Sequence, residues 1–382
     1  MAQANKAANS QNSGQFRCFD DCRRASPTYL FQPMPQKKIS FQMRTFHLPE
    51  NHPSLPHPKI GVLILHLGTP DDTSFGSMRR YYREFLSDKR VIDYPRWFWL
   101  PILYGIILNT RPGRKGRDYD KIWDQEANDS PLRVYAKSQA KKLEQAFGED
   151  VLVDYAFRYA NPSTKDALER MKQAGVDRIV ALALYPHYSS ATTATGYDAI
   201  FDQLKKMKWQ PSLITLPPYH DNPAYVESLA KSIDEKLATI DWEPDLIVTS
   251  YHGAPERYLR EGDPYHCHCF KTTRLLGEAR PAIANKLKVT FQSRFGPEKW
   301  LQPYTDKTLE SLPSEGIKKV LVICPGFSVD NLETLEEINM EAREEFIESG
   351  GENFDYIPCL NDSPQHIDLI KTLCTKGVEA FR

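Results

Sequence analysis

The 382-residue chain lacks an apolar run long enough to cross a membrane. The nearest approach is Trp97–Leu108, twelve residues interrupted by Pro101 and Gly105, whereas a membrane-spanning helix needs roughly 18 or more. The chain also lacks an excess of positive charge, because 49 Lys and Arg residues face 50 Asp and Glu residues. Proteins that bind nucleic acid normally carry such an excess. We therefore expect neither a membrane-spanning protein nor a nucleic-acid partner.

Cysteine is scarce, and the short glycine-rich catalytic motifs are missing. The seven cysteines form no dense framework of the kind found in secreted proteins, which indicates a reducing, cytoplasmic compartment. The sequence contains no GxxxxGK[ST] phosphate loop, no GxGxxG after a strand and no GxSxG nucleophile elbow. Neither nucleotide binding nor a serine nucleophile of that type therefore has a motif to support it.

Two regions of different composition divide the chain. Residues 1–57 are rich in Ala, Asn, Gln, Ser and Pro and show no sustained apolar periodicity, so we expect a disordered or extraneous extension. From Lys59 onward, short runs of Val, Ile and Leu alternate with amphipathic stretches. The runs predict eight strands buried on both faces, at 60–67, 151–157, 179–185, 213–216, 246–251, 289–292, 320–324 and 354–357.

The alternation of strands and helices predicts an α/β fold with parallel sheets. Helical patterns fill the gaps between the strands, at 163–173, 194–207, 223–238, 331–348 and 364–374. We expect two similar, doubly wound, Rossmann-like halves with a cleft between them. The expected halves are 58–186, with a C-terminal helix at 365–382 packing back on it, and 187–364.

Polar side chains follow several of these strands, where ligands bind in such folds. His252 ends an apolar strand and is followed by Gly253. A neutral imidazole there can accept a proton or ligate a metal, or it can simply satisfy a backbone carbonyl. Glu333 and Glu337 lie four residues apart on one helix, with Asp330 just upstream. Acids are common in a first helical turn, but like charges at this spacing are unfavourable, so they are candidates for a metal or proton path.

A second group of metal-ligating residue types occurs at His266, Cys267, His268 and Cys269. On a strand only two of the four could share a face. The usual zinc spacing, with a second pair downstream, is missing. We therefore do not expect a metal site here.

Taken in order, the motifs of this chain resemble those of the ferrochelatases, enzymes that insert Fe²⁺ into a porphyrin. The resemblance covers Lys59 to Cys374. It is carried by LGTPDD at 67–72, FLSDKRVIDYP at 85–95, FRYANPS at 157–163, YPHYSSATTAT at 185–195, TSYHGAP at 249–255, REGDPYH at 260–266, TFQSRFGPEKWLQP at 290–303 and CPGFSVDNLETLEEI at 324–338.

The resemblance implies a lyase that makes protohaem from protoporphyrin IX and ferrous iron, the last step of haem biosynthesis. Alternatives are a coproporphyrin III ferrochelatase, a cobalt-chelating relative and, from another class, a non-catalytic tetrapyrrole or haem carrier. It also implies site residues. These are His252 and Glu333 for catalysis and metal binding, Glu337 and Asp330 as secondary acids of a proton path, Leu67, Arg158, Tyr159, Tyr185, Gln292 and Ser293 for porphyrin binding, and Trp97 and Trp99 in an apolar lip.

The lip, residues 94–108, matches a segment that touches membranes in some members of the family, which implies a peripheral position at the inner membrane. Two departures from the family pattern matter. Asn331 stands where some members have a His beside the catalytic acid. Ser190 replaces one cysteine ligand of the [2Fe–2S] cluster found in some members, and only eight residues follow Cys374, so we expect no such cluster. His66 and His187 stand where Asn and Gln are frequent, and their roles stay open.

Overall fold

The computed structural model describes residues 58–382, and the expected extension at residues 1–57 lies outside them. All eight expected strands are present, in two four-stranded parallel sheets. The first sheet, in the order β2-β1-β3-β4, contains β1 (Lys59–Gly68), β2 (Val151–Tyr159), β3 (Val176–Ala183) and β4 (Ser212–Thr215). The second, in the order β6-β5-β7-β8, contains β5 (Leu246–His252), β6 (Leu287–Gln292), β7 (Lys319–Ile323) and β8 (Asn353–Ile357).

Helices connect the strands in both halves. Those up to β4 are α1 (Phe75–Ser87), α2 (Arg96–Ile102), α3 (Leu108–Ile122), α4 (Pro131–Phe147), α5 (Thr164–Gln173) and α6 (Thr195–Leu204), with π-helical turns at Leu103–Ile107 and Ser190–Ala194. The later ones are α7 (Pro223–Leu237), α8 (Glu256–Arg260), α9 (Tyr265–Ala279), α10 (Thr305–Ser311), α11 (Leu332–Leu335), α12 (Arg343–Glu348) and α13 (Pro364–Glu379). Short 3₁₀ turns lie at Pro281–Lys286 and Leu312–Glu315.

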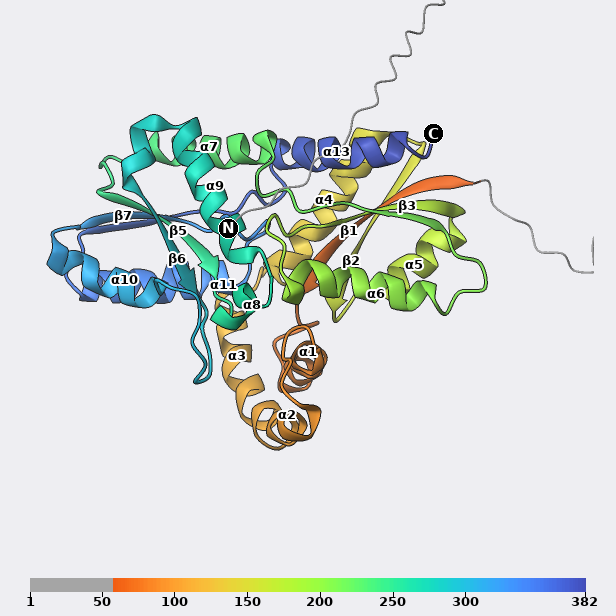
Figure 1. The fold of residues 1–382 in the computed structure, drawn as a ribbon, viewed down its shortest axis with the longest axis horizontal. Coiled ribbons are helices and arrows are strands. Elements are labelled where there is room, and N and C mark those ends of the chain that lie inside the picture. Colours follow the sequence, from red (N-terminus) through yellow and green to blue (C-terminus); the bar gives the residue numbers. More distant parts are fainter. Residues whose placement is uncertain (1–57) are drawn as a thin grey trace, which may run out of the picture. The chain divides into compact units, whose positions relative to one another are not determined.

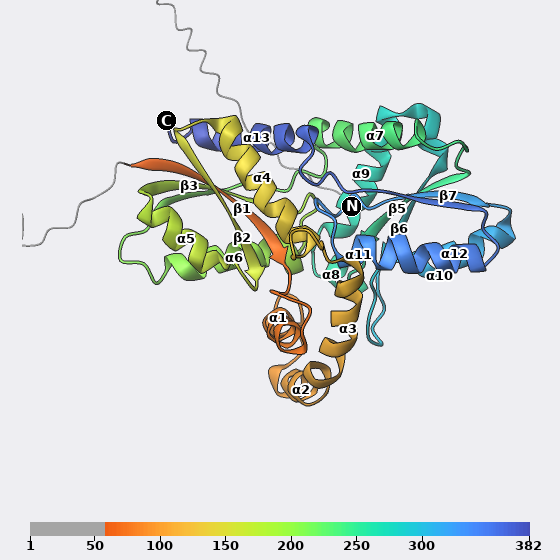
Figure 2. The same ribbon diagram turned by 180° about the vertical axis from the view of Figure 1, so that it is seen from behind.

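Alternate side chains of the central strands build the core on both faces of each sheet. On β1, Val62 and Ile64 pack with α4, α7 and α13, whereas Leu63 and Leu65 pack with α5 and α6. Figures 1 and 2 show these two helical layers on opposite sides of the strands. In each half two central strands, β1 and β3 or β5 and β7, have parallel neighbours on both sides, and the other two strands form the edges. The predicted α/β fold with two doubly wound halves is confirmed.

The first sheet extends further along the chain than expected. β4 pairs with β3 in register from Arg178 and Ser212 to Ala181 and Thr215, so the expected boundary after residue 186 falls before the last strand of the first sheet. β3 and β4 are about thirty residues apart in the sequence. The composition of either segment does not reveal that the two pair. Helix α13 packs on β1, β3 and α4, but it also contacts α7.

Helix assignments differ from expectation in two places. The helix expected at 331–348 is divided into α11, a π-helical segment at Glu337–Ala342, and α12. Such wide turns occur frequently at functional sites. The His266–Cys269 cluster, considered as part of a strand, lies at the start of helix α9. Asp263 and Pro264 lie directly before that helix, and the Asp263 carboxylate accepts from the Tyr265 N–H. The first turn mixes polar and apolar residues, so its apolar positions show no helical periodicity.

Between β1 and α4, helices α1, α2 and α3 project away from both sheets (Figures 1 and 2). At their base, Met78 of α1 and Tyr119 and Ile122 of α3 pack against Leu332 of α11. The far end of this excursion carries the lip. The lip is therefore connected through α1 and α3 to the acid-bearing helix of the second half.

Candidate active site

Two neighbouring strands of the second sheet end side by side at His252 and Gln292, which are paired residues of β5 and β6. His252 is half-buried, and its Nδ1 lies 2.7 Å from the carbonyl oxygen of Gly253. A carbonyl oxygen only accepts, so Nδ1 must carry the proton. This leaves the Nε2 lone pair of a neutral imidazole available to a metal ion or a proton.

Glu333 is brought to the same end of the sheet by the short helix α11. Asn331 caps this helix, because its Oδ1 accepts from the Thr334 N–H at 3.2 Å and its own N–H donates to Thr334 Oγ1 at 3.1 Å. The Gln292 amide nitrogen donates to the main-chain carbonyl of Glu333 at 2.7 Å. Gln292 thus touches the main chain of both His252's strand and Glu333's helix. At the position where some ferrochelatases resembling this chain have a histidine, Asn331 instead caps helix α11.

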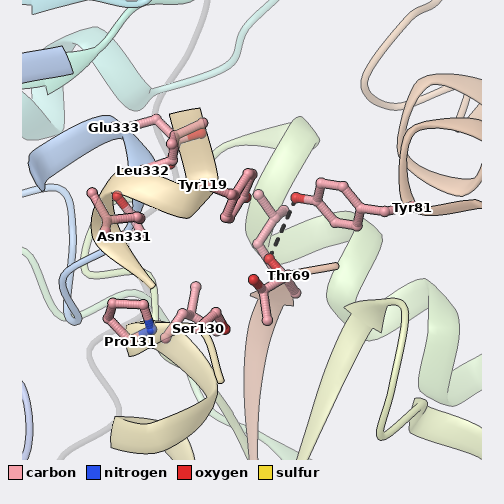
Figure 3. A pocket seen from close by; sticks show the side chains of 12 residues that line it. Thr69, Tyr81, Tyr119, Ser130, Pro131, Asn331, Leu332 and Glu333 are labelled. Atoms are coloured by element: carbon pink, nitrogen blue, oxygen red, sulfur yellow. Dashed lines mark hydrogen bonds between the residues drawn. The ribbon is translucent and has the colours of Figure 1, made fainter. Parts of the chain in front are cut away.

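A small cavity of about 30 Å³ lies beside Glu333, where Leu67 near the end of β1 and Thr69 just after it meet Tyr81 of α1 and Tyr119 of α3 (Figure 3). That volume holds roughly two water molecules. Tyr81 donates to the carbonyl of Gly68 at 3.3 Å. Burial, and then the charge of Glu333, raises the pKa of Tyr119 well above its ordinary value. The tyrosines therefore stay neutral around the acid.

Glu337 lies one helical turn beyond Glu333 and is held by two groups. Ser293, in the left-handed region at φ 63°, donates its hydroxyl to the Glu337 carboxylate. Lys115 of α3 lies 3.8 Å from the other carboxylate oxygen. Burial, followed by the negative charge of Glu333, raises the pKa of Glu337 to about 7, although Ser293 and Lys115 both act to lower it. An acid with this pKa can take up and release protons at neutral pH.

We expect the pH dependence of kcat to report Glu337. If Glu337 must be ionised to receive protons, kcat rises with pH through about 7. Replacing Lys115 with Met removes a charge that lowers this pKa, so the rising limb should move to higher pH, and Glu337→Gln should abolish it. The measurement is kcat from pH 5.5 to 9 at saturating porphyrin and iron. A limb that stays in place in both variants would contradict the assignment.

The other expected porphyrin residues form a group in the first half. Arg158 forms a salt bridge to Asp88 and donates through Nε to Thr195 Oγ1 at 2.6 Å. Tyr159 is fully buried and donates to Asp88 at 2.9 Å. Its ring meets Phe85, which in turn stacks on Tyr81 at 6.0 Å between ring centres. This group therefore adjoins the cavity, but the Tyr159 hydroxyl is already bonded.

Asp330 lies apart from the acids that it was expected to accompany. Its carboxylate is buried and accepts from Tyr356 and Asn361, each at 2.6 Å, and from Thr334 at 3.1 Å. Among the described residues no hydrogen bond connects it to Glu337. These contacts anchor the loop before α11, so the proton-path role expected of Asp330 gains no support.

The two lip tryptophans have opposite environments. The Trp97 side chain is 80 % exposed, whereas Trp99 is 6 % exposed and donates its indole N–H to the Leu86 carbonyl at 2.7 Å. Trp99 packs with Leu103 and Leu108 in a small core. Of the two tryptophans expected in the lip, only Trp97 presents its side chain on the surface, because residues two apart on a helix point to nearly opposite sides.

Other histidines among residues 58–382 are buried or stack on a neighbouring ring. His66 and His187 are both buried, and burial lowers the pKa of each. His268 stacks on His220 with 3.6 Å between ring centres. Across residues 58–382 no three His, Cys, Asp or Glu side chains are grouped so as to hold a metal ion. Sequence reasoning missed Tyr81, Tyr119 and Lys115, whose positions in amphipathic helices carry no signal beyond packing.

Comparison with known proteins identifies the family of this chain. Residues 59–378 match the sequence profile of the ferrochelatases. The ferrochelatase of Allorhizobium ampelinum is 52 % identical over 337 residues, covering 88 % of this chain and 98 % of the relative. That of Rhizobium meliloti is 53 % identical over 332 residues, covering 86 % and 98 %. Among solved structures, SirB from Bacillus subtilis with Fe³⁺ superposes with a TM-score of 0.52 at 10 % identity, over 84 % of this chain and 95 % of that one, which shows a shared fold. The chain belongs to the ferrochelatase family.

Proposed function

We propose that this ferrochelatase converts protoporphyrin IX to protohaem, with His252 and Glu333 as its catalytic and iron-binding pair. One observation carries the proposal. His252, whose Nε2 lone pair is available, pairs with Gln292 between β5 and β6, and the Gln292 side chain donates to the main-chain carbonyl of Glu333. One residue therefore connects the strand end that bears the imidazole with helix α11, which bears the carboxylate.

The chemistry requires such a pair. A flat porphyrin holds its two N–H groups in the ring plane, so metal insertion needs a bent macrocycle and a base for two departing protons. Imidazole and carboxylate bind Fe²⁺ weakly enough to release it to four ring nitrogens. Glu337, with a pKa of about 7, can pass protons onward. Iron is the substrate here and leaves with the product.

The exposed lip supports protoporphyrin over coproporphyrin III. Trp97, Phe98, Tyr104 and Ile106 are exposed apolar side chains, and they match the apolar vinyl edge of protoporphyrin better than a porphyrin with four propionates. Turnover assays with each porphyrin and Fe²⁺ test this choice. The loss of porphyrin fluorescence measures the rate of metal insertion. Faster turnover with coproporphyrin III would contradict the choice, and stoichiometric binding without turnover would indicate a carrier.

We also propose that no [2Fe–2S] cluster is bound, because such clusters need four thiolates. Ser190, at the position of a cluster ligand in some relatives, receives a hydrogen bond from Arg90 at 3.4 Å. Among residues 58–382, Cys267 is exposed, Cys359 is half-buried, and Cys269, Cys324 and Cys374 are buried. No three of the described His, Cys, Asp or Glu side chains are grouped so as to hold a metal ion, so these thiols do not fit such a cluster.

The lip is further proposed to rest on a membrane surface. No helix among residues 58–382 is long and apolar enough to span a bilayer. Next to the exposed lip residues, α3 carries the exposed Arg111, Arg114 and Arg117, and each such charge near an anionic lipid surface contributes about 1 kcal/mol. Apolar side chains beside basic ones are typical of peripheral attachment.

Substituting the two tryptophans one at a time should affect different properties: vesicle binding for Trp97 and the stability of the fold for Trp99. Trp97→Ser should weaken binding to phosphatidylglycerol vesicles and leave the unfolding free energy within about 0.5 kcal/mol, because the side chain is exposed. Trp99→Ala should cost about 3–5 kcal/mol, as a large buried side chain does. Urea unfolding and vesicle co-sedimentation measure both. Equal stability losses would contradict the difference in burial.

A further inference from the structure

The side chain of Gln292 connects β5, the strand of His252, with α11, the helix of Glu333. It is 5 % exposed and uses both ends of its amide. Nε2 donates to the Glu333 carbonyl and Oε1 accepts from Ser250 Oγ, each at 2.7 Å. Because the Glu333 carbonyl only accepts, the amide nitrogen must face it, and the orientation of the side chain follows.

The Oε1 end of the Gln292 amide is held by Ser250, inside the second sheet. Ser250 lies two residues before His252 on β5, is fully buried, and has its Oγ 3.0 Å from Thr305 Oγ1 of α10. The main chain of Gln292 is fixed as well, since its carbonyl accepts from the Gly253 N–H at 2.7 Å. A buried polar network whose members all have partners is rigid.

The Nε2 end of the Gln292 amide bonds to α11, a helix too short to be rigid by itself. Helix α11 is a single turn of four residues, followed closely by the π-helical segment. A side-chain bond to the carbonyl of Glu333 itself therefore restrains the residue that presents the carboxylate. The buried amide has both of its ends occupied and offers little surface to a porphyrin.

We propose that Gln292 is a positioning residue that sets Glu333 against His252, and not a porphyrin contact. The inference rests on the proposed roles of His252 and Glu333. Displacement of a reacting group by about 1 Å can cost on the order of 10²-fold in rate. Loss of the Gln292 bond should therefore lower kcat and leave the KM for porphyrin unchanged.

Two variants of equal length test this in the full chain. Gln292→Met removes both bonds, and Gln292→Glu retains an acceptor for Ser250 but, when ionised, has no donor for the Glu333 carbonyl. Both should lower kcat by about 10- to 10²-fold, with unchanged porphyrin affinity by fluorescence titration. Ser250→Ala is the matched control, because it removes only the bond to Oε1 and should cost less. A raised porphyrin KM at unchanged kcat would overturn the proposal in favour of a porphyrin contact.

A double-mutant cycle separates this inference from the proposed function. If Gln292 acts through Glu333, then Gln292→Met should cause no further loss of kcat in a Glu333→Gln protein. Independent losses that multiply would show a general structural role and overturn the proposal. The Glu333→Gln single variant tests the proposed function separately. Unchanged turnover in that variant would reject the catalytic role of Glu333, independently of the result for Gln292. Melting temperatures of all variants identify any that fail to fold, and Gln292→Glu, with its retained Ser250 bond, then carries the test.

Discussion

His252→Ala and Glu333→Gln should each lower kcat by about 10²-fold or more, the usual cost of removing a general base or metal ligand. The structure leaves Nε2 of His252 available and holds Glu333 at the neighbouring strand end. In the proposed mechanism both groups act on the metal and on departing protons, not on the porphyrin's apolar body. Porphyrin affinity, measured by fluorescence titration, should therefore barely change.

The double variant should be little slower than the slower single variant, because residues that act as one unit are not additive. His266→Asn is the matched control. It replaces a half-buried histidine at the start of α9 whose ring contacts Phe270, and its turnover should match the wild type. If His266→Asn abolishes turnover and His252→Ala does not, the metal site has been assigned to the wrong histidine.

The second large effect is a loss of stability in weak acid. His66 and His366 are 4 % and 1 % exposed. Burial, and next the proximity of His366, lowers the pKa of His66 to about 3, and burial lowers that of His366 to about 4. Between these values and 6.5 the unfolded chain binds protons that the folded chain excludes. The free energy of unfolding is therefore highest above pH 6.5 and falls as the pH decreases, by about 1.4 kcal/mol per pH unit for each such group.

His66→Asn isolates one of these contributions. Between pH 5 and 6.5 few carboxylates titrate in the unfolded chain, and Glu337, whose raised pKa has the opposite effect, contributes equally to both proteins. Averaged over this range, in which the unfolded imidazole passes from fully to half protonated, the slope of unfolding free energy against pH in the variant should be smaller by about 1 kcal/mol per unit. Urea unfolding at four pH values measures it. Parallel slopes would mean that His66 is protonated in the folded protein.

The site was partly predictable because part of it depends on local pattern. His252 was located by the rule that ligands bind where parallel strands end, and the apolar runs identified all eight strands. The spacing of Glu333 and Glu337 indicated a shared face, but it left their function open. Their proposed roles came from the ordered motifs shared with ferrochelatases.

Contacts between distant segments decided the rest. Trp97 and Trp99 are chemically equal in the sequence, yet only packing against Leu103 and Leu108 buries the second. The hydrogen bonds of Gln292 join residues 41 or 42 positions away, and β4 joins β3 across a helix. Apolar periodicity is a property of neighbouring residues, so by itself the sequence determined the elements, their alternation and the fold class. Burial, hydrogen-bond partners and pKa values arise only when distant segments meet and exclude water. The tertiary structure therefore decided that the pKa of Glu337 lies near neutral pH and that Gln292 holds helix α11.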